Sequence, residues 1–240
     1  MTKNKWRIIF YISIALIYII YSHARPLWHP IKLKLTGQKT LAEVIETLEV
    51  PQSFYWEELL KKKKVDLDKS ELYLIALKQG RKLEVWLKSE LKSTKLCTYP
   101  FTGFSGELGP KIIEGDGQIP EGIYKISSLN PNSSYHLSMK IDYPNEYDKA
   151  MAKDQNRTNL GSNIFIHGKS VTIGCIPIGD KNIESLFYLV HEIGINRVTA
   201  LISPQDFRVD KILINHTKEA WIKHKYQKLY INMCLFTKSE

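Results

Sequence analysis

The spacing of apolar residues between residues 72 and 202 constrains the fold more than any other feature of the chain. Short runs of strand-forming residues alternate there with turns that contain Gly or Pro. Two runs, 72–77 and 83–87, flank a Gln79-Gly80 turn and are predicted to form a hairpin. Further strands are predicted at 95–99, 122–127, 136–141, 163–167 and 196–202. We therefore expect strands to dominate this region.

Helical spacing occurs on both sides of these runs and once within them. Thr40 and Glu43 form a capping-box pattern, which predicts a short helix that ends near Pro51. Further amphipathic helices are predicted over 53–64, 183–193 and 218–229. The chain has no internal repeat and no low-complexity tract. These patterns predict one compact unit of mixed α+β class, mostly β.

The first 24 residues have the layout of an export segment. Lys3, Lys5 and Arg7 precede an apolar run over 8–21, and Ser22-His23-Ala24 offers a small-x-small cleavage pattern. The run is shorter than the roughly 20 apolar residues of a membrane span, which favours a cleaved signal peptide. Aromatic residues at interfacial positions are also compatible with a membrane anchor over 6–21 that is retained. A buried helix of a cytosolic protein is the third alternative.

Net charge limits the classes of binding partner, and cysteine content limits the disulfides that the chain can form. The formal net charge is +9, and it is +6 without residues 1–24, whose only charged residues are three cations. A basic surface favours an anionic partner, although the Lys61–Lys64 run is typical of a solvated helix end. No pattern indicates a nucleic-acid partner. Cys97, Cys175 and Cys234 make no disulfide framework, and a Cys97–Cys234 bridge is a hypothesis that would leave Cys175 free.

Residues 166–176 read Ile-His-Gly-Lys-Ser-Val-Thr-Ile-Gly-Cys-Ile. His167 and Cys175 are the base and the nucleophile that acyl transfer through a thioester requires. Gly174 allows unusual backbone dihedrals, so that the thiol and the N–H of Cys175 can face a reacting carbonyl. Spacing alone is equally compatible with an inert buried cysteine and a structural histidine.

The order of these residues resembles a known signature. His167-Gly168 followed by Thr172-Ile173-Gly174-Cys175 resembles the active-site motif of the L,D-transpeptidase (YkuD-type) catalytic domain, with Ile173 where many members carry histidine. The segments 105–111, 114–124, 130–136 and 142–145 resemble the YafK-like branch of that family. The resemblance extends from about residue 72 to about residue 207.

The resemblance implies a mostly antiparallel, two-sheet catalytic domain at 71–207 with peripheral helices. Residues 1–24 would be the leader or anchor, 25–70 a helical lead-in packed on the domain, and 208–240 a helical extension. It also implies a bacterial, exported protein of the periplasm or cell envelope, monomeric and without a cofactor. The substrate would be the peptidoglycan stem peptide, attacked at the carbonyl of its diamino acid. An amine acceptor gives a cross-link, and water gives hydrolysis, including release of a wall-attached lipoprotein.

Site residues follow from the motif. Cys175 and His167 are the expected catalytic pair, and the N–H groups of Gly174 and Cys175 the expected oxyanion donors. Weaker expectations of substrate binding fall on Thr172, Gly168, Lys169, Lys111, Tyr143 and Asn145. His136 and His191 are expected to be structural or exposed.

Two rival functions use the same residues. A zinc site would gather His136, His167, Cys175 and His191, but the paired ligand spacing of structural zinc is missing. A wall-binding module with a dead active site would not need the intact His167–Cys175 pair.

Overall fold

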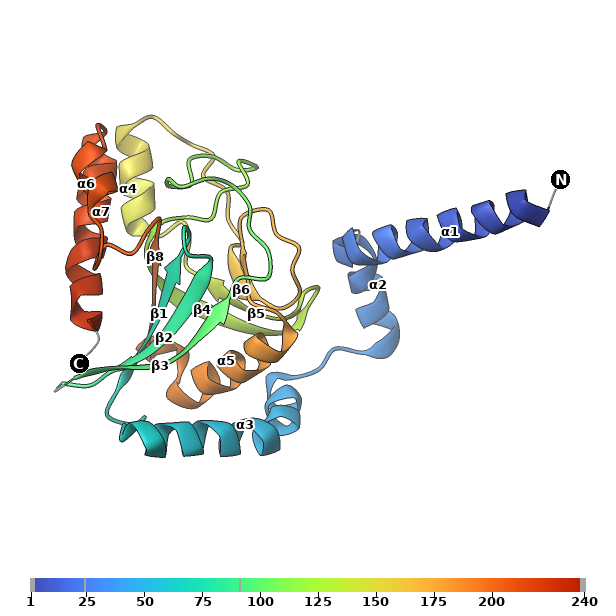
Figure 1. Ribbon diagram of the computed structural model, residues 1–240, viewed down its shortest axis with the longest axis horizontal. Helices are drawn as coiled ribbons and strands as arrows, with labels where there is room; N and C mark the ends of the chain where they lie inside the picture. Colours follow the sequence, from blue (N-terminus) through green and yellow to red (C-terminus); the bar gives the residue numbers. More distant parts are fainter. Residues whose placement is uncertain (1–2, 24, 91, 238–240) are drawn as a thin grey trace.

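A computed structural model describes residues 3–23, 25–90 and 92–237 (Figure 1). Its centre is an eight-stranded sheet in the order β3-β2-β1-β8-β4-β5-β6-β7. The strands are β1 Glu71–Leu77, β2 Lys82–Lys88, β3 Ser93–Pro100, β4 Gly122–Ser133, β5 His136–Ile141, β6 Phe165–His167, β7 Ile176–Pro177 and β8 Val198–Ser203. The β1–β8 and β6–β7 pairs are parallel, and the other five are antiparallel. The mixed α+β class is thus confirmed.

Strand β4 belongs to both halves of the sheet. Residues 122–125 pair with β8, and from Ile126 onward the strand pairs with β5, with a register shift between Ile126 and Ser128. Such an irregularity bends a strand and increases its twist. The half that contains β5, β6 and β7 is therefore turned relative to the half that contains β1, β2, β3 and β8, as the expected two-sheet arrangement requires.

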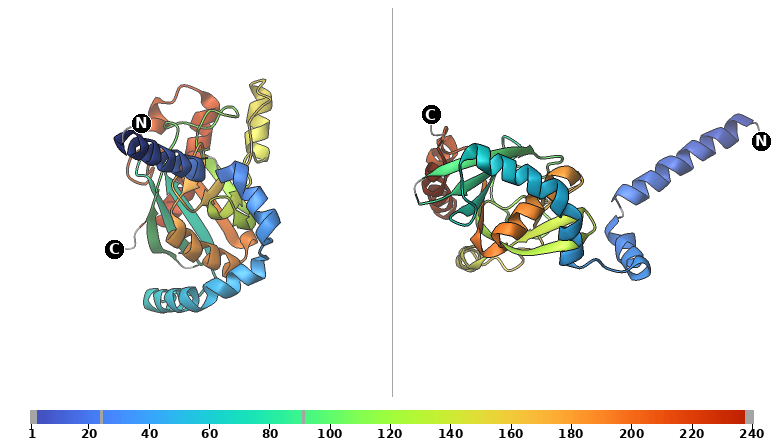
Figure 2. Two further views of the ribbon diagram at one scale, coloured as in Figure 1. Left: turned by 90° about the vertical axis from the view of Figure 1, so that its right-hand side faces the viewer. Right: turned by 90° about the horizontal axis from the view of Figure 1, so that it is seen from below.

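Helices cover both faces of the β1 region. Leu72, Leu74 and Ala76 point into a core shared with α3 (Leu41–Lys63) and α5 (Asp180–Ile193). Ile75 and Leu77 point into a second core against α7 (Ala220–Met233) and η2 (Cys234–Phe236). Figures 1 and 2 show α3 and α5 on one side of the strands and α7 on the other. Since both faces are buried, β1 is apolar or aromatic without alternation from Leu72 to Leu77.

The predicted break at Pro51 is wrong, because α3 is one helix that continues through it. Proline removes one backbone hydrogen bond and normally kinks or ends a helix. Here packing outweighs that cost: Leu48 before the proline and Trp56 after it are both buried, and Trp56 Nε1 donates to the carbonyl of Ser185 at 3.0 Å. The capping box of Thr40 and Glu43 is confirmed.

The other elements differ from expectation mainly at their ends. β4 runs six residues beyond the predicted end, to Ser133, and the helix predicted over 183–193 begins at Asp180. Besides α1, the elements without a prediction of their own are β7, η2, α2 Arg25–Thr36, α4 Glu146–Asp154, α6 Ile212–His216 and η1 Ile195–Arg197. All three cysteines are free thiols, so the Cys97–Cys234 bridge is not formed.

The N-terminal segment forms helix α1, Lys3–His23. Ala24, the last residue of the expected cleavage pattern, lies outside the described residues. Across 3–23, 25–90 and 92–237, none of the helices combines the length and apolar content needed to cross a membrane.

Candidate active site

The register of two short parallel strands brings the His167 and Cys175 positions together. β6 and β7 pair Ile166 with Ile176 and His167 with Pro177. Cys175 directly precedes β7 and so lies at the level of Phe165, two residues from His167. The register therefore places Cys175 next to the strand that carries His167.

The His167 imidazole is buried and held in one tautomer. Its Nδ1 lies 2.5 Å from the carbonyl oxygen of Gly168, and since a carbonyl only accepts, Nδ1 carries the hydrogen. Nε2 is then the atom free to accept a proton. Burial lowers the pKa of His167 to about 4, with the Gly168 contact acting in the opposite direction. The ring is therefore neutral at physiological pH.

Cys175 is partly exposed and protonated at rest. Burial raises the pKa of its thiol to about 11, while a backbone contact with Phe165 and the charge of Lys111 lower it. Its Sγ lies 3.9 Å from the carbonyl oxygen of Asn163. In the described part of the chain no hydrogen bond joins Sγ to the His167 ring, so the resting thiol is turned toward the backbone of residues 163–165.

Tyr135 lies beside both members of the pair. Its ring packs against that of His167, with centroids 4.7 Å apart and planes tilted by 34°. Burial, and secondarily the nearby Cys175, raise the pKa of Tyr135. Sequence reasoning missed this residue, although it lies in one of the segments that carry the resemblance. The only available signal was an aromatic residue directly before a predicted strand.

Thr172 organises the turn that carries Cys175. Its Oγ1 accepts hydrogen bonds from the N–H of Gly174 at 3.2 Å and of Cys175 at 2.8 Å, and donates to the carbonyl of Cys175 at 2.8 Å. The two amides expected to bind an oxyanion therefore already have an acceptor. An oxyanion can use them only by displacing the Thr172 hydroxyl, and this hydroxyl shapes the turn rather than facing a substrate.

Two glycines near Cys175 occupy positions where a Cβ atom would clash with a neighbouring oxygen. Gly174 has φ +128°, and a Cβ there would lie 2.9 Å from the carbonyl oxygen of Gln118. A Cβ on Gly168 would lie 2.6 Å from Oδ1 of Asp180. Gly168 therefore has a packing role, and its predicted role in substrate binding is not supported.

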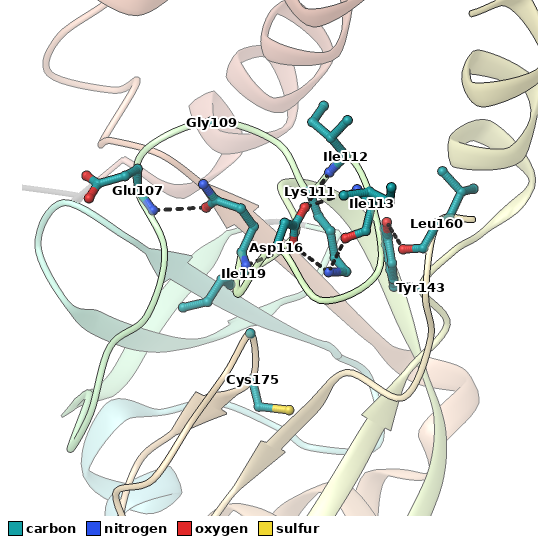
Figure 3. Close-up of polar contacts among 12 residues, drawn as sticks. Glu107, Gly109, Lys111, Ile112, Ile113, Asp116, Ile119, Tyr143, Leu160 and Cys175 are labelled. Atoms are coloured by element: carbon teal, nitrogen blue, oxygen red, sulfur yellow. Dashed lines mark hydrogen bonds and ion pairs between the residues drawn. The ribbon is translucent and has the colours of Figure 1, made fainter. Parts of the chain in front are cut away.

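The two lysines expected near the substrate have internal partners. Lys169 donates its backbone N–H to Asp180 at 2.8 Å, and its ammonium pairs with the same carboxylate. Lys111 is buried, with Nζ 2.6 Å from Asp116 and 3.0 Å from the carbonyl of Ile113 (Figure 3). Both ammonium groups are thus paired with a carboxylate of the chain itself, and the charge of Lys111 lowers the pKa of Cys175.

Tyr143 and Asn145, two of the residues expected to bind substrate, have internal hydrogen-bond partners. Tyr143 is buried and its hydroxyl donates to the carbonyl of Leu160 at 3.0 Å. Asn145 is the N-cap of α4 and forms a capping box with Asp148, while its Nδ2 donates to the carbonyl of Ile123.

The loop between β3 and β4, residues 101–121, passes over Cys175 (Figure 3). It is fixed by a fully buried ion pair, Lys78 Nζ to Glu121 Oε1 at 2.8 Å. Lys78 also donates to the carbonyls of Gly109 and Ile119, and Glu121 accepts from the N–H of Gly109. At the other end Thr102 donates to the carbonyl of Lys169. The loop is thus bonded to both the core and the catalytic turn.

The histidines of the rival zinc site have other partners. His136 Nε2 lies 2.6 Å from Glu184, and His191 Nδ1 lies 3.2 Å from Glu192. Over the described residues, no group of three or more His, Cys, Asp or Glu side chains is arranged to hold a metal ion.

Comparison with known sequences gives one family. The family model described as L,D-transpeptidase catalytic domain matches residues 64–201, more than half of the chain. Two curated relatives from Escherichia coli, strain K12 and O157:H7, carry the name "Putative L,D-transpeptidase YafK". Each is 33% identical over 132 residues, which cover 54% of this chain and 51% of the relative. The chain spans about half the length of the curated relatives it matches.

Solved structures give weaker similarities. The helical cell shape determining protein Pgp2 from Campylobacter jejuni has a TM-score of 0.46 at 18% identity, covering 78% of this chain and 79% of that one. Bd1075 from Bdellovibrio bacteriovorus has a TM-score of 0.43 at 26% identity, covering 57% and 49%. Both scores are below 0.5, so the two structures add nothing to the fold described above.

Proposed function

Because the chain belongs to the L,D-transpeptidase catalytic domain family, we propose that it is a peptidoglycan-modifying cysteine acyltransferase. Cys175 is the nucleophile and His167 the base. The observation that carries this assignment is the β6–β7 register, which brings Cys175 next to the strand of His167, with His167 Nδ1 fixed on Gly168 and Nε2 left to accept a proton.

The first half-reaction transfers one proton and forms one thioester. The Cys175 thiol turns from the Asn163 carbonyl toward His167, Nε2 takes its proton, and Sγ attacks the substrate carbonyl carbon. The tetrahedral intermediate collapses as the C–N bond breaks, and the imidazolium returns the proton to the departing amine. Since thiol and imidazole are both neutral at rest, the proton moves with the attack rather than before it.

The second half-reaction reverses these roles. His167 takes a proton from an amine acceptor, which attacks the thioester and releases the Cys175 thiol. Water in place of the amine gives a carboxylate product. The N–H groups of Gly174 and Cys175 stabilise both oxyanions after the Thr172 hydroxyl moves aside.

The substrate is the peptidoglycan stem peptide, with the thioester on the carbonyl of its diamino acid. This assignment rests on the family and on the resemblance to the YafK-like branch. The same support extends to a wall-attached lipoprotein as the released group when water is the acceptor. Export to the cell envelope rests on the basic flank and apolar run of residues 1–24, removed as a signal peptide or retained as an anchor.

Mass spectrometry of purified muropeptides incubated with the enzyme tests the proposal. An amine-linked product forms if the enzyme is a transferase, and a carboxylate forms if it is a hydrolase. Cys175→Ala should abolish either product, whereas Cys97→Ala and Cys234→Ala should leave it unchanged. Turnover at the wild-type level in Cys175→Ala would rule out this nucleophile.

A carbapenem supplies an independent probe of the same site. An adduct of one carbapenem on Cys175, lost in His167→Ala, supports the nucleophile and base assignment. Binding of intact peptidoglycan without turnover or adduct would instead identify a wall-binding module.

A further inference from the structure

The N-terminal 42 residues carry charge of one sign only. They contain seven Lys and Arg residues, and the first acidic residue of the chain is Glu43. The rest of the chain has 27 Lys and Arg against 25 Asp and Glu, so its charges nearly balance. The positive charge of this protein is therefore concentrated in α1, α2 and the residues that follow α2.

Helix α2, Arg25–Thr36, has two different faces. Leu27, Ile31 and Leu35 follow one another at intervals of four and are 77%, 60% and 82% exposed. They form an apolar ridge, since residues four apart lie on one side of a helix. On the other side, Arg25, His29 and Thr36 line a cavity of about 500 Å³ whose far wall includes Ser133 and His136.

Helix α1, like the ridge, exposes apolar side chains. Trp6, Phe10, Ile14 and Ile17 of α1 are all largely exposed, and α1 extends away from the sheet at the end where α2 lies (Figures 1 and 2). Isolated exposed apolar residues are ordinary, but a set of this size on consecutive helices indicates a contact surface. Exposed apolar side chains beside cations are typical of a helix that lies along a bilayer surface.

We propose that α2 is an interfacial helix that binds an anionic lipid bilayer. The ridge of Leu27, Ile31 and Leu35 enters the acyl boundary, and Lys34, on the same side of the helix, contacts the acidic headgroups. A second copy of this chain is disfavoured as the occupant, because two such segments would bring like charges together.

The placement of α2 connects this surface with the active site. The link after α2 is fixed to the end of β4 by Asn132, which accepts from the N–H of Lys39 at 2.9 Å and donates to its carbonyl at 2.7 Å. Tyr135, which packs on His167, lies in the turn that follows β4, and the charge of Arg25 lowers its pKa. A bilayer bound to α2 would hold the catalytic site close to the membrane surface. The lipid contact itself does not depend on the proposed chemistry of Cys175.

Vesicle flotation of the full chain tests the proposal. The chain is transferred from detergent to vesicles of phosphatidylcholine with or without 30% phosphatidylglycerol. The ridge variant Leu27→Glu/Ile31→Glu/Leu35→Glu should lower the partition coefficient on anionic vesicles at least about tenfold. The matched control Val50→Glu/Val209→Glu/Ile231→Glu replaces three exposed apolar residues elsewhere with the same charge and should bind like the wild type.

Hydrogen exchange localises the contact. Anionic vesicles should slow amide exchange over 25–36 in the wild type and in the control, and not in the ridge variant. Unchanged exchange over 25–36 in the bound wild type would overturn the proposal, because α1 alone would then bind. Equal affinity for neutral vesicles would overturn the role of charge. A lipid-free dimer that the ridge variant loses would make a second copy the occupant.

Discussion

The hydroxyl of Thr172 accepts the amide hydrogen of Cys175 at 2.8 Å and donates its own hydrogen to the carbonyl of the same residue at 2.8 Å. A single side chain thus satisfies both backbone groups of the proposed nucleophile, and it also accepts from Gly174. In the resting enzyme this hydroxyl occupies the donors that an oxyanion would need. The turn that carries Cys175 is therefore held in shape by the group that moves aside in the proposed mechanism.

Replacing Thr172 tests whether its hydroxyl shapes the turn that carries Cys175. Thr172→Ser keeps the hydroxyl and should retain activity within a few-fold. Thr172→Val leaves the Cys175 N–H and carbonyl without their partner, so the turn loosens and kcat should fall by about 10², the scale of a small misplacement of a reacting group. Steady-state kinetics on muropeptides give the comparison. Equal kcat in the valine and serine variants would show that the hydroxyl does not shape the site.

Burial of His167 makes stability depend on pH. Its folded pKa of about 4 lies below the ordinary value of 6.5, so the unfolded chain binds the extra proton between these values. The resulting contribution to the free energy of unfolding is about 3 kcal/mol. It is fully present above pH 6.5 and is lost as pH falls toward 4. Urea unfolding at several pH values measures it. His167→Gln, which does not titrate, should lose this slope, and an unchanged slope would place the titrating group elsewhere.

Much of the fold was predictable because its signals are local. The hairpin of β1 and β2 follows from two apolar runs around Gln79-Gly80, and the capping box at Thr40 follows from residue type and spacing. The continuation of α3 through Pro51 was not predictable, since it depends on burial of Trp56 against a helix more than 120 residues away.

The candidate site shows the same difference between local signals and contacts distant in the sequence. The pair of His167 and Cys175 could be proposed from the sequence because both lie on one short segment. The packing of Tyr135 on His167 depends on the pairing of β5 with β6, and the internal partners of Lys169 and Tyr143 depend on segments distant in the chain. Residue type therefore indicated the chemistry, while tertiary contacts decided which polar side chains remain free.

Tyr135 should set the basicity of His167 through its ring. Tyr135→Phe keeps the packed ring, so the pKa of His167 should stay near 4. Tyr135→Ala admits water to the imidazole, and the pKa should move up toward 6.5. Titration of the His167 Cε1 proton by NMR measures both, and the acid limb of the pH–rate profile should move with it. An alanine variant whose His167 still titrates near 4 would contradict this role.

The Lys78–Glu121 pair should be needed to keep the loop over Cys175 in place. Both side chains are fully buried, and Glu121 Oε2 also accepts from the hydroxyl of Tyr226 at 2.7 Å. Glu121→Gln leaves the Lys78 ammonium without its counter-charge, which typically costs about 3–5 kcal/mol. Urea unfolding measures the loss, and proteolysis within residues 101–121 should become faster. The exposed pair Lys149–Glu146 is the control, since Glu146→Gln should cost at most about 1 kcal/mol. If the two variants lose the same stability, the buried pair does not anchor the loop.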